Sequence, residues 1–74
     1  MSKTEQNKIL YTVACVNEFA KSKSLTTIQA FLYLLEHKAI HFLDEFYDVE
    51  HTLSFEDAVS DLTRVSLQNG GKIQ

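Results

Sequence analysis

Apolar residues recur along this chain at the three- and four-residue spacing of amphipathic helices. The first stripe comprises Ile9, Val13, Val16 and Ala20, which fall within a narrow arc when each residue turns the helix by about 100°. At its start, Ser2-Lys3-Thr4-Glu5 has the S-x-x-E form of a capping box, which satisfies two free amides at the beginning of a helix. The pattern therefore predicts a first helix that starts at Ser2 and buries one stripe.

A second capping box, Thr26-Thr27-Ile28-Gln29, follows a short polar connector and predicts the start of a second helix. Residues 30–35 are apolar on every side, and a helix without a polar face is usually central or covered by a partner. The positions expected to form its main apolar face are Ile28, Phe31, Leu32 and Leu35. The remaining sides are filled by Ala30, Tyr33 and Leu34.

A third helix is predicted after the polar break at residues 36–38. Apolar residues return at helical spacing at Ile40, Leu43, Phe46 and Tyr47. Because Lys38 is not a helix breaker, the second and third helices could instead form one kinked rod.

Residues 47–53 lack a helical stripe and are expected to form a connecting turn, in which Asp48 bonds its own backbone. Ser54 then caps a fourth helix, and Asn69-Gly70 closes it. The inward stripe predicted for this helix is Phe55, Ala58, Val59, Leu62 and Val65.

The composition strengthens the helical prediction. The chain has no proline, and its two glycines lie together near the end, so it lacks the turn residues that an all-β chain needs. A hydrophobic content of 45% is sufficient for a folded core, and 74 residues have room for one. We therefore expect an all-α protein, a small bundle of four helices, in which residues 1–74 form a single helical domain.

The single cysteine and the lack of a long apolar segment indicate a soluble cytoplasmic protein. Cys15 has no second thiol in the chain, which favours a reducing compartment and a buried, inert side chain. The polar N-terminus does not resemble a secretory signal. The most apolar stretch, residues 9–20, is interrupted by Thr12, Asn17 and Glu18, so no membrane span is expected.

Charge is distributed unevenly, although the net charge is only −3. Residues 39–63 contain seven acids and neither lysine nor arginine. This acidic half would repel a phosphate backbone, and the predicted helix starts offer few cations to base edges. We therefore expect no nucleic-acid partner, and a transcriptional regulator is kept as an alternative.

No catalytic motif is recognisable, so neither a catalytic residue nor a cofactor is predicted. His37 and His41 would face the same side of a continuous helix, and Asp44 or His51 could add a third metal ligand. The chain has neither H-E-x-x-H nor paired C-x-x-C spacing, which favours solvated histidines and no metal. A metal-dependent or nucleotide-handling small enzyme is the alternative built on these four residues.

The segment Tyr47-Asp48-x-x-His51-Thr52, with Cys15–Ala20, the Thr26 helix start and the glycine end, resembles a family of short bacterial proteins, domain of unknown function 3791. The resemblance covers roughly residues 8–71. The family often has glycine at the position of Lys38, which leaves the end of the second helix open. Its genes often lie beside that of an ADP-ribosyltransferase-like protein. The resemblance thus implies a toxin-neutralising, antitoxin-like role or an accessory partner of such a protein.

The candidate partner-binding residues are Tyr47, Asp48, Glu50 and His51. A structural interpretation has Tyr47 packing, Asp48 turning the chain and His51 bonding back across the loop. A functional one makes these residues a contact surface for a cationic pocket.

The function predicted from the sequence is a non-enzymatic protein-interaction module. In it the acidic half selects a protein partner, and surplus apolar groups serve partner binding or a homodimer. The groups expected to be in surplus are Tyr11, Tyr33, Leu34 and Phe42.

Overall fold

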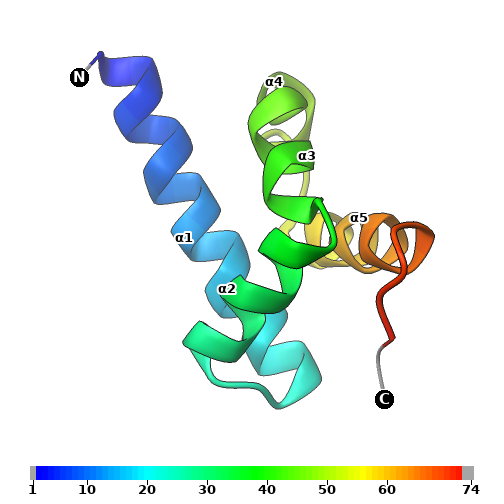
Figure 1. Cartoon of the computed structure of the whole chain (residues 1–74). Coiled ribbons are helices and arrows are strands. Elements are labelled where there is room, and N and C mark those ends of the chain that lie inside the picture. Colours follow the sequence, from blue (N-terminus) through cyan, green and yellow to red (C-terminus); the bar gives the residue numbers. More distant parts are fainter. Residues whose placement is uncertain (1, 73–74) are drawn as a thin grey trace.

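A computed structural model describes residues 2–72, and this part of the chain is helical without any strand. The elements are α1 (Lys3–Lys23), α2 (Thr27–Glu36), α3 (Ala39–Glu45), α4 (Tyr47–Glu50) and α5 (Phe55–Gln68). Figure 1 shows α2 and α3 in front, the long α1 along one side and α5 behind. The predicted all-α bundle is confirmed, with the short α4 as an additional turn of helix. Within residues 2–72, none of these helices is both long and apolar enough to cross a bilayer.

The three predicted helix starts are confirmed by their caps. The Ser2 hydroxyl accepts a hydrogen bond from the Glu5 amide at 3.1 Å, and the Ser54 hydroxyl accepts one from the Asp57 amide at the same distance. At α2 the capping box is complete, because Thr26 accepts from the Gln29 amide and the Gln29 side chain accepts from the Thr26 amide. Each cap satisfies amides that the first turn of a helix leaves unpaired.

The chain reverses between α2 and α3 at Lys38. This residue has a φ of 67° and a ψ of 9°, in the left-handed region that favours glycine. Its amide bonds to the Leu35 carbonyl at 3.3 Å, which closes the end of α2. The helices are therefore separate, and the alternative of one kinked rod is wrong.

Residues 47–50 are helical, where the sequence predicted only a turn. The Glu50 amide bonds to the Phe46 carbonyl at 2.8 Å, and the His51 amide bonds to the Tyr47 carbonyl at 3.0 Å. These bonds join residues four apart, as in an α-helix. Asp48 therefore lies in a helical turn, and not in a loop closed by a bond from its own side chain to the backbone. The sequence shows no apolar stripe in this segment because a helix of four residues is too short to produce one.

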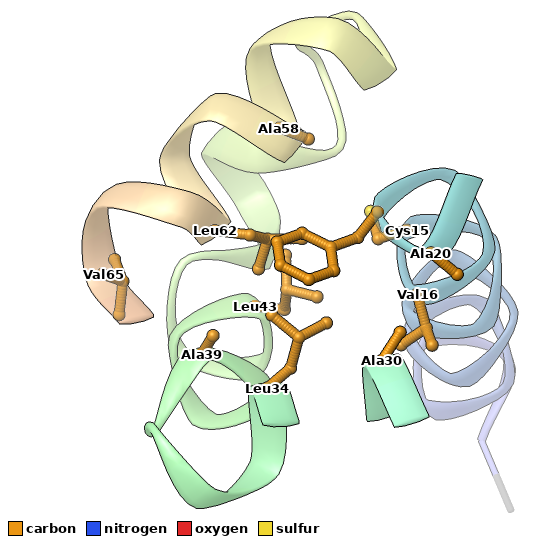
Figure 2. Close-up of a cluster of buried hydrophobic side chains, with 11 residues drawn as sticks. Cys15, Val16, Ala20, Ala30, Leu34, Ala39, Leu43, Ala58, Leu62 and Val65 are labelled. Atoms are coloured by element: carbon orange, nitrogen blue, oxygen red, sulfur yellow. The ribbon is translucent and has the colours of Figure 1, made fainter. Parts of the chain in front are cut away.

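The core lies where α1, α2, α3 and α5 meet. Figure 2 shows Val16 of α1 beside Ala30 of α2, with Leu34, Leu43 and Leu62 gathered between the helices. Four of the eleven buried apolar residues are alanines, which allow helices to approach closely but contribute little buried area. The buried apolar residues are Cys15, Val16, Phe19, Ala20, Ala30, Leu34, Ala39, Leu43, Ala58, Leu62 and Val65.

Candidate functional site

The predicted contact residues lie on α4 and directly after it. The rings of Tyr47 and His51 are stacked, with centroids 4.5 Å apart and planes 9° from parallel. Nδ1 of His51 lies 2.6 Å from the Tyr47 carbonyl oxygen. Since a carbonyl only accepts, this geometry assigns the hydrogen to Nδ1. The histidine is therefore held by the helix that precedes it.

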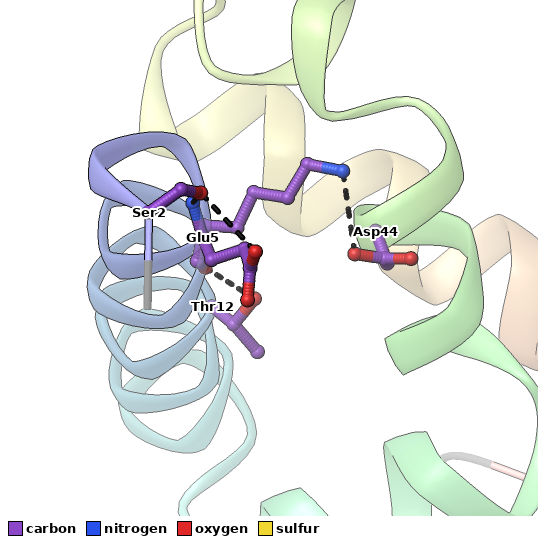
Figure 3. Close-up of polar contacts among 5 residues, drawn as sticks. Ser2, Glu5, Thr12 and Asp44 are labelled. Carbon is purple, nitrogen blue, oxygen red and sulfur yellow. Dashed lines mark hydrogen bonds and ion pairs between the residues drawn. The ribbon is translucent and has the colours of Figure 1, made fainter.

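Tyr47 also fastens α4 to α1. Its ring meets the Tyr11 ring edge to face at 5.6 Å, and Lys8 Nζ lies 5.9 Å from the Tyr47 ring centroid. Lys8 Nζ is also 3.5 Å from the Asp44 carboxylate of α3 (Figure 3). Tyr47 is thus partly buried by contacts within the chain, as the structural interpretation of this residue expected.

Glu50 lies inside the protein, with only 4% of its surface exposed. Its backbone carbonyl accepts a hydrogen bond from the Tyr11 hydroxyl at 2.8 Å. Its side-chain Oε1 is buried and has no hydrogen-bond partner among the described residues. The Glu50 carboxyl therefore cannot belong to an exposed contact surface in this conformation.

The burial of Glu50 changes the protonation of its carboxyl group. Desolvation by burial is the main cause that raises the pKa of Glu50 to about 7, and the neighbouring Asp61 carboxyl contributes in the same direction. Arg64 opposes the shift, and its guanidinium lies 3.5 Å from the Asp61 carboxylate. A carboxyl group that keeps its proton to a higher pH costs less to bury than a carboxylate.

Asp48 and His51 are the exposed members of the predicted set. Asp48 lies in the first turn of α4, where a negative charge is favourable but is not required to close a loop. The structure brings Tyr47 and His51 together, leaves Asp48 at the surface and withdraws Glu50. Partner binding by these residues stays a prediction, and the surface available for it is centred on Asp48 and His51.

The histidines considered as metal ligands are dispersed. Nδ1 of His37 lies 3.1 Å from the Asn69 carbonyl, and its ring packs on Tyr33 with centroids 4.7 Å apart. The reversal at Lys38 separates His37 from His41, which is exposed on α3. Among residues 2–72, no group of three or more potential ligands is close enough to hold a metal ion.

Cys15 is enclosed in the core. Its exposed fraction is 0%, and desolvation is the main reason that its thiol pKa is raised. A raised pKa disfavours the nucleophilic thiolate. The thiol therefore packs as a small apolar group, as predicted.

The largest departure from the predicted surface is on α2. The side buried in the core is that of Ala30 and Leu34, whereas the face expected to be buried is exposed. We call this exposed face the α2 stripe, and the exposed fractions of its members are Ile28 72%, Phe31 40%, Leu32 57% and Leu35 43%. Sequence reasoning could not choose the side, because residues 30–35 are apolar all round.

Of the four residues predicted to be in surplus, three are only partly enclosed. Leu34 is fully buried, and Tyr11, Tyr33 and Phe42 are partly buried and pack against the core. The prediction is therefore wrong for Leu34, whereas the three aromatic rings lie incompletely enclosed at the edges of the core.

The α2 stripe continues onto α1. An apolar groove runs between the two helices, with Val13 and Val16 on one wall and Ile28, Phe31 and Leu32 on the other. Ile9 and Val13 were expected to be buried and are half-exposed beside this groove. Two neighbouring helices therefore present one apolar surface outside the core.

The family model described as "Protein of unknown function (DUF3791)" matches residues 10–66, which is most of the chain. The chain belongs to this family. The DUF3791 match extends from the first half of α1 to the last turn of α5, so it contains both the α2 stripe and α4. The resemblance inferred from the sequence is thereby confirmed. Searches of curated proteins and of solved structures found no match.

Proposed function

We propose that this DUF3791 protein is a non-enzymatic protein-interaction module that binds through the α2 stripe. The supporting observation is that large apolar side chains at positions 28, 31, 32 and 35 are exposed on one helix. Spacing of i, i+3, i+4 and i+7 is how amphipathic helices present anchors to another helix. Contiguous exposed apolar patches on small proteins commonly mark such contacts.

The acidic half gives this proposal its sharper form. Asp48 and His51 lie within the segment from residue 39 to 63 that has no lysine or arginine, so a cationic partner surface would be attracted to them. An antitoxin-like or accessory role beside an ADP-ribosyltransferase-like protein in the cytoplasm fits both surfaces. The α2 stripe would supply affinity for a protein partner or a second copy, and the charges would select a cationic partner.

The test is purification of the untagged protein from its native host in three forms: wild type, Leu32→Lys and the Asp48→Ala/His51→Ala double variant. We expect wild type to elute in a stable complex whose partner is identified by mass spectrometry and reconstituted from pure components. Leu32→Lys should abolish that complex, and the double variant should weaken it.

Leu67→Lys is the matched control, because Leu67 is 50% exposed on α5, outside both proposed surfaces, and Leu32 is 57% exposed on α2. Elution of wild type as a lone monomer, in the host extract and after purification, would refute the proposed function. A complex that survives Leu32→Lys would remove the α2 stripe from it.

A further inference from the structure

We infer that the partner of the α2 stripe is α2 of a second copy of this chain, packed antiparallel about a two-fold axis between Phe31 and Leu32. This inference rests on the proposed function and names the occupant of its surface. Homo-oligomers with two-fold symmetry use the same surface on both copies, so the surface must be complementary to itself.

The α2 stripe meets that requirement residue by residue. A two-fold axis between Phe31 and Leu32 places Ile28 opposite Leu35 of the second copy and Phe31 opposite Leu32 of the second copy. Each large apolar side chain in the stripe then faces another one. Side chains at this spacing interdigitate in antiparallel helix pairs.

The electrostatics of α2 favour the antiparallel direction. The first turn of α2 contains no acid and its last turn contains no base, so neither end of the helix dipole is compensated by its own residues. The charged residue of α2 is Glu36, at the end where the free carbonyls are already negative. His37 Nε2 lies 3.9 Å from Glu36, an ion pair only when the ring is protonated.

Antiparallel pairing corrects this mismatch. The same axis brings Glu36 opposite Thr27 of the second copy, at the amide end of its α2, where a negative charge is favourable. Parallel pairing would set the two Glu36 carboxylates beside each other. Charge complementarity therefore matches α2 to its own antiparallel copy.

The surroundings of the stripe add apolar area without adding unpaired charge. Ile9 and Val13 extend it along α1, and the groove between α1 and α2 can receive side chains from the second copy. At the edge of this surface Lys8 is already paired with Asp44 at 3.5 Å. Asp44, which belongs to the acidic segment 39–63, lies at this edge beside Ile9 and Phe31, and Lys8 offsets its charge. A neutral apolar surface of this kind suits a second copy better than a strongly charged protein.

The first test measures molar mass by sedimentation equilibrium over a concentration series from micromolar to millimolar. We expect wild type to approach twice the chain mass and Leu32→Lys to raise the dimer dissociation constant by about 30-fold or more, as for a central anchor of an interface. Val49→Lys, on α4, should change the dimer dissociation constant by less than about threefold. Circular dichroism at low concentration should show both variants folded, because both positions are more than half exposed.

The second test determines direction. Ile28→Cys and Leu35→Cys proteins are mixed and treated with a short bis-maleimide, to which the buried Cys15 is inaccessible. We expect a cross-link that joins one variant to the other, identified by peptide mass spectrometry. Parallel pairing would instead join Ile28→Cys chains to each other, and that result would overturn the antiparallel arrangement.

The outcomes separate this inference from the proposed function. A pure protein that stays monomeric at every concentration refutes the second copy, whatever the host extract contains. If the host complex is still lost with Leu32→Lys, the interaction module stands and its partner is a different protein. A dimer disrupted by Val49→Lys but not by Leu32→Lys would refute the α2 interface.

Discussion

The α2 stripe and the α4 turn are both at the surface, but their side chains are committed in different ways. On α4, Tyr47 packs on Tyr11, His51 stacks on Tyr47, and Glu50 points into the interior. On α2, Phe31 and Leu32 belong to a row of large side chains that leave much of their apolar area in water. The fold explains most of α4, whereas it leaves the outward side of α2 without a structural role. The proposed interface therefore lies on α2.

The two sides of α2 should respond to the same substitution very differently. Leu34→Ala removes a fully buried side chain and leaves a cavity, so we expect the free energy of unfolding to fall by about 2 to 5 kcal/mol. Leu32→Ala, at a site 57% exposed, should cost less than about 1 kcal/mol in dilute protein. Urea unfolding at low concentration measures both. Equal losses would mean that Leu32 is part of the core.

Local signals in the sequence were sufficient to predict the three capped helix starts. Ser2, Thr26 and Ser54 cap their helices as predicted because a cap involves only the next three residues. The buried side of α2 could not be predicted, because apolar residues on every side remove the periodic signal. It is decided by the fit of Ala30 and Leu34 against α1 and α3.

The candidate site was predictable in its residues but not in their arrangement. The sequence singled out Tyr47 and His51, and the structure stacks them. The burial of Glu50 had no sequence signal, since carboxylates are normally assigned to the surface. It depends on the tertiary packing around α4, in which the Tyr11 hydroxyl of α1 donates a hydrogen bond to the Glu50 carbonyl.

The buried carboxyl should make α4 sensitive to pH. The pKa of Glu50 is raised from 4.5 to about 7 in the folded protein, so its contribution to stability is fully present below about pH 4.5. This contribution is lost as the pH rises through about 7. We expect the free energy of unfolding of wild type to fall by about 2 kcal/mol between pH 5 and pH 8. Glu50→Gln should remove most of this pH dependence.

Asp48→Asn is the control for this experiment, because it changes an exposed carboxyl on the same helix. Its stability should follow the wild-type pH dependence. Urea unfolding at several pH values provides the measurement. A wild-type slope that persists in Glu50→Gln would show that Glu50 does not hold the proton.

Glycine in place of Lys38 should stabilise the reversal of the chain between α2 and α3. Lys38 has a φ of 67°, which costs a residue with a Cβ about 1 kcal/mol relative to glycine. We expect Lys38→Gly to raise the midpoint of urea unfolding by a corresponding amount. Glu36→Gly, at the last residue of α2, should not raise the midpoint, because this residue does not have a positive φ. Destabilisation by both variants would argue against the left-handed conformation.

The smallest effect on stability is expected at Asp48, and it separates the two surfaces most directly. Asp48→Ala removes an exposed charge from the first turn of a four-residue helix, so the free energy of unfolding should change by less than about 0.5 kcal/mol. Self-association through the α2 stripe should be unaffected, because Asp48 lies on α4. Binding of a cationic partner should weaken, with the loss largest at low salt. Titration calorimetry with the reconstituted partner at two salt concentrations would show this, and unchanged affinity at low salt would leave the α2 stripe as the sole proposed contact surface.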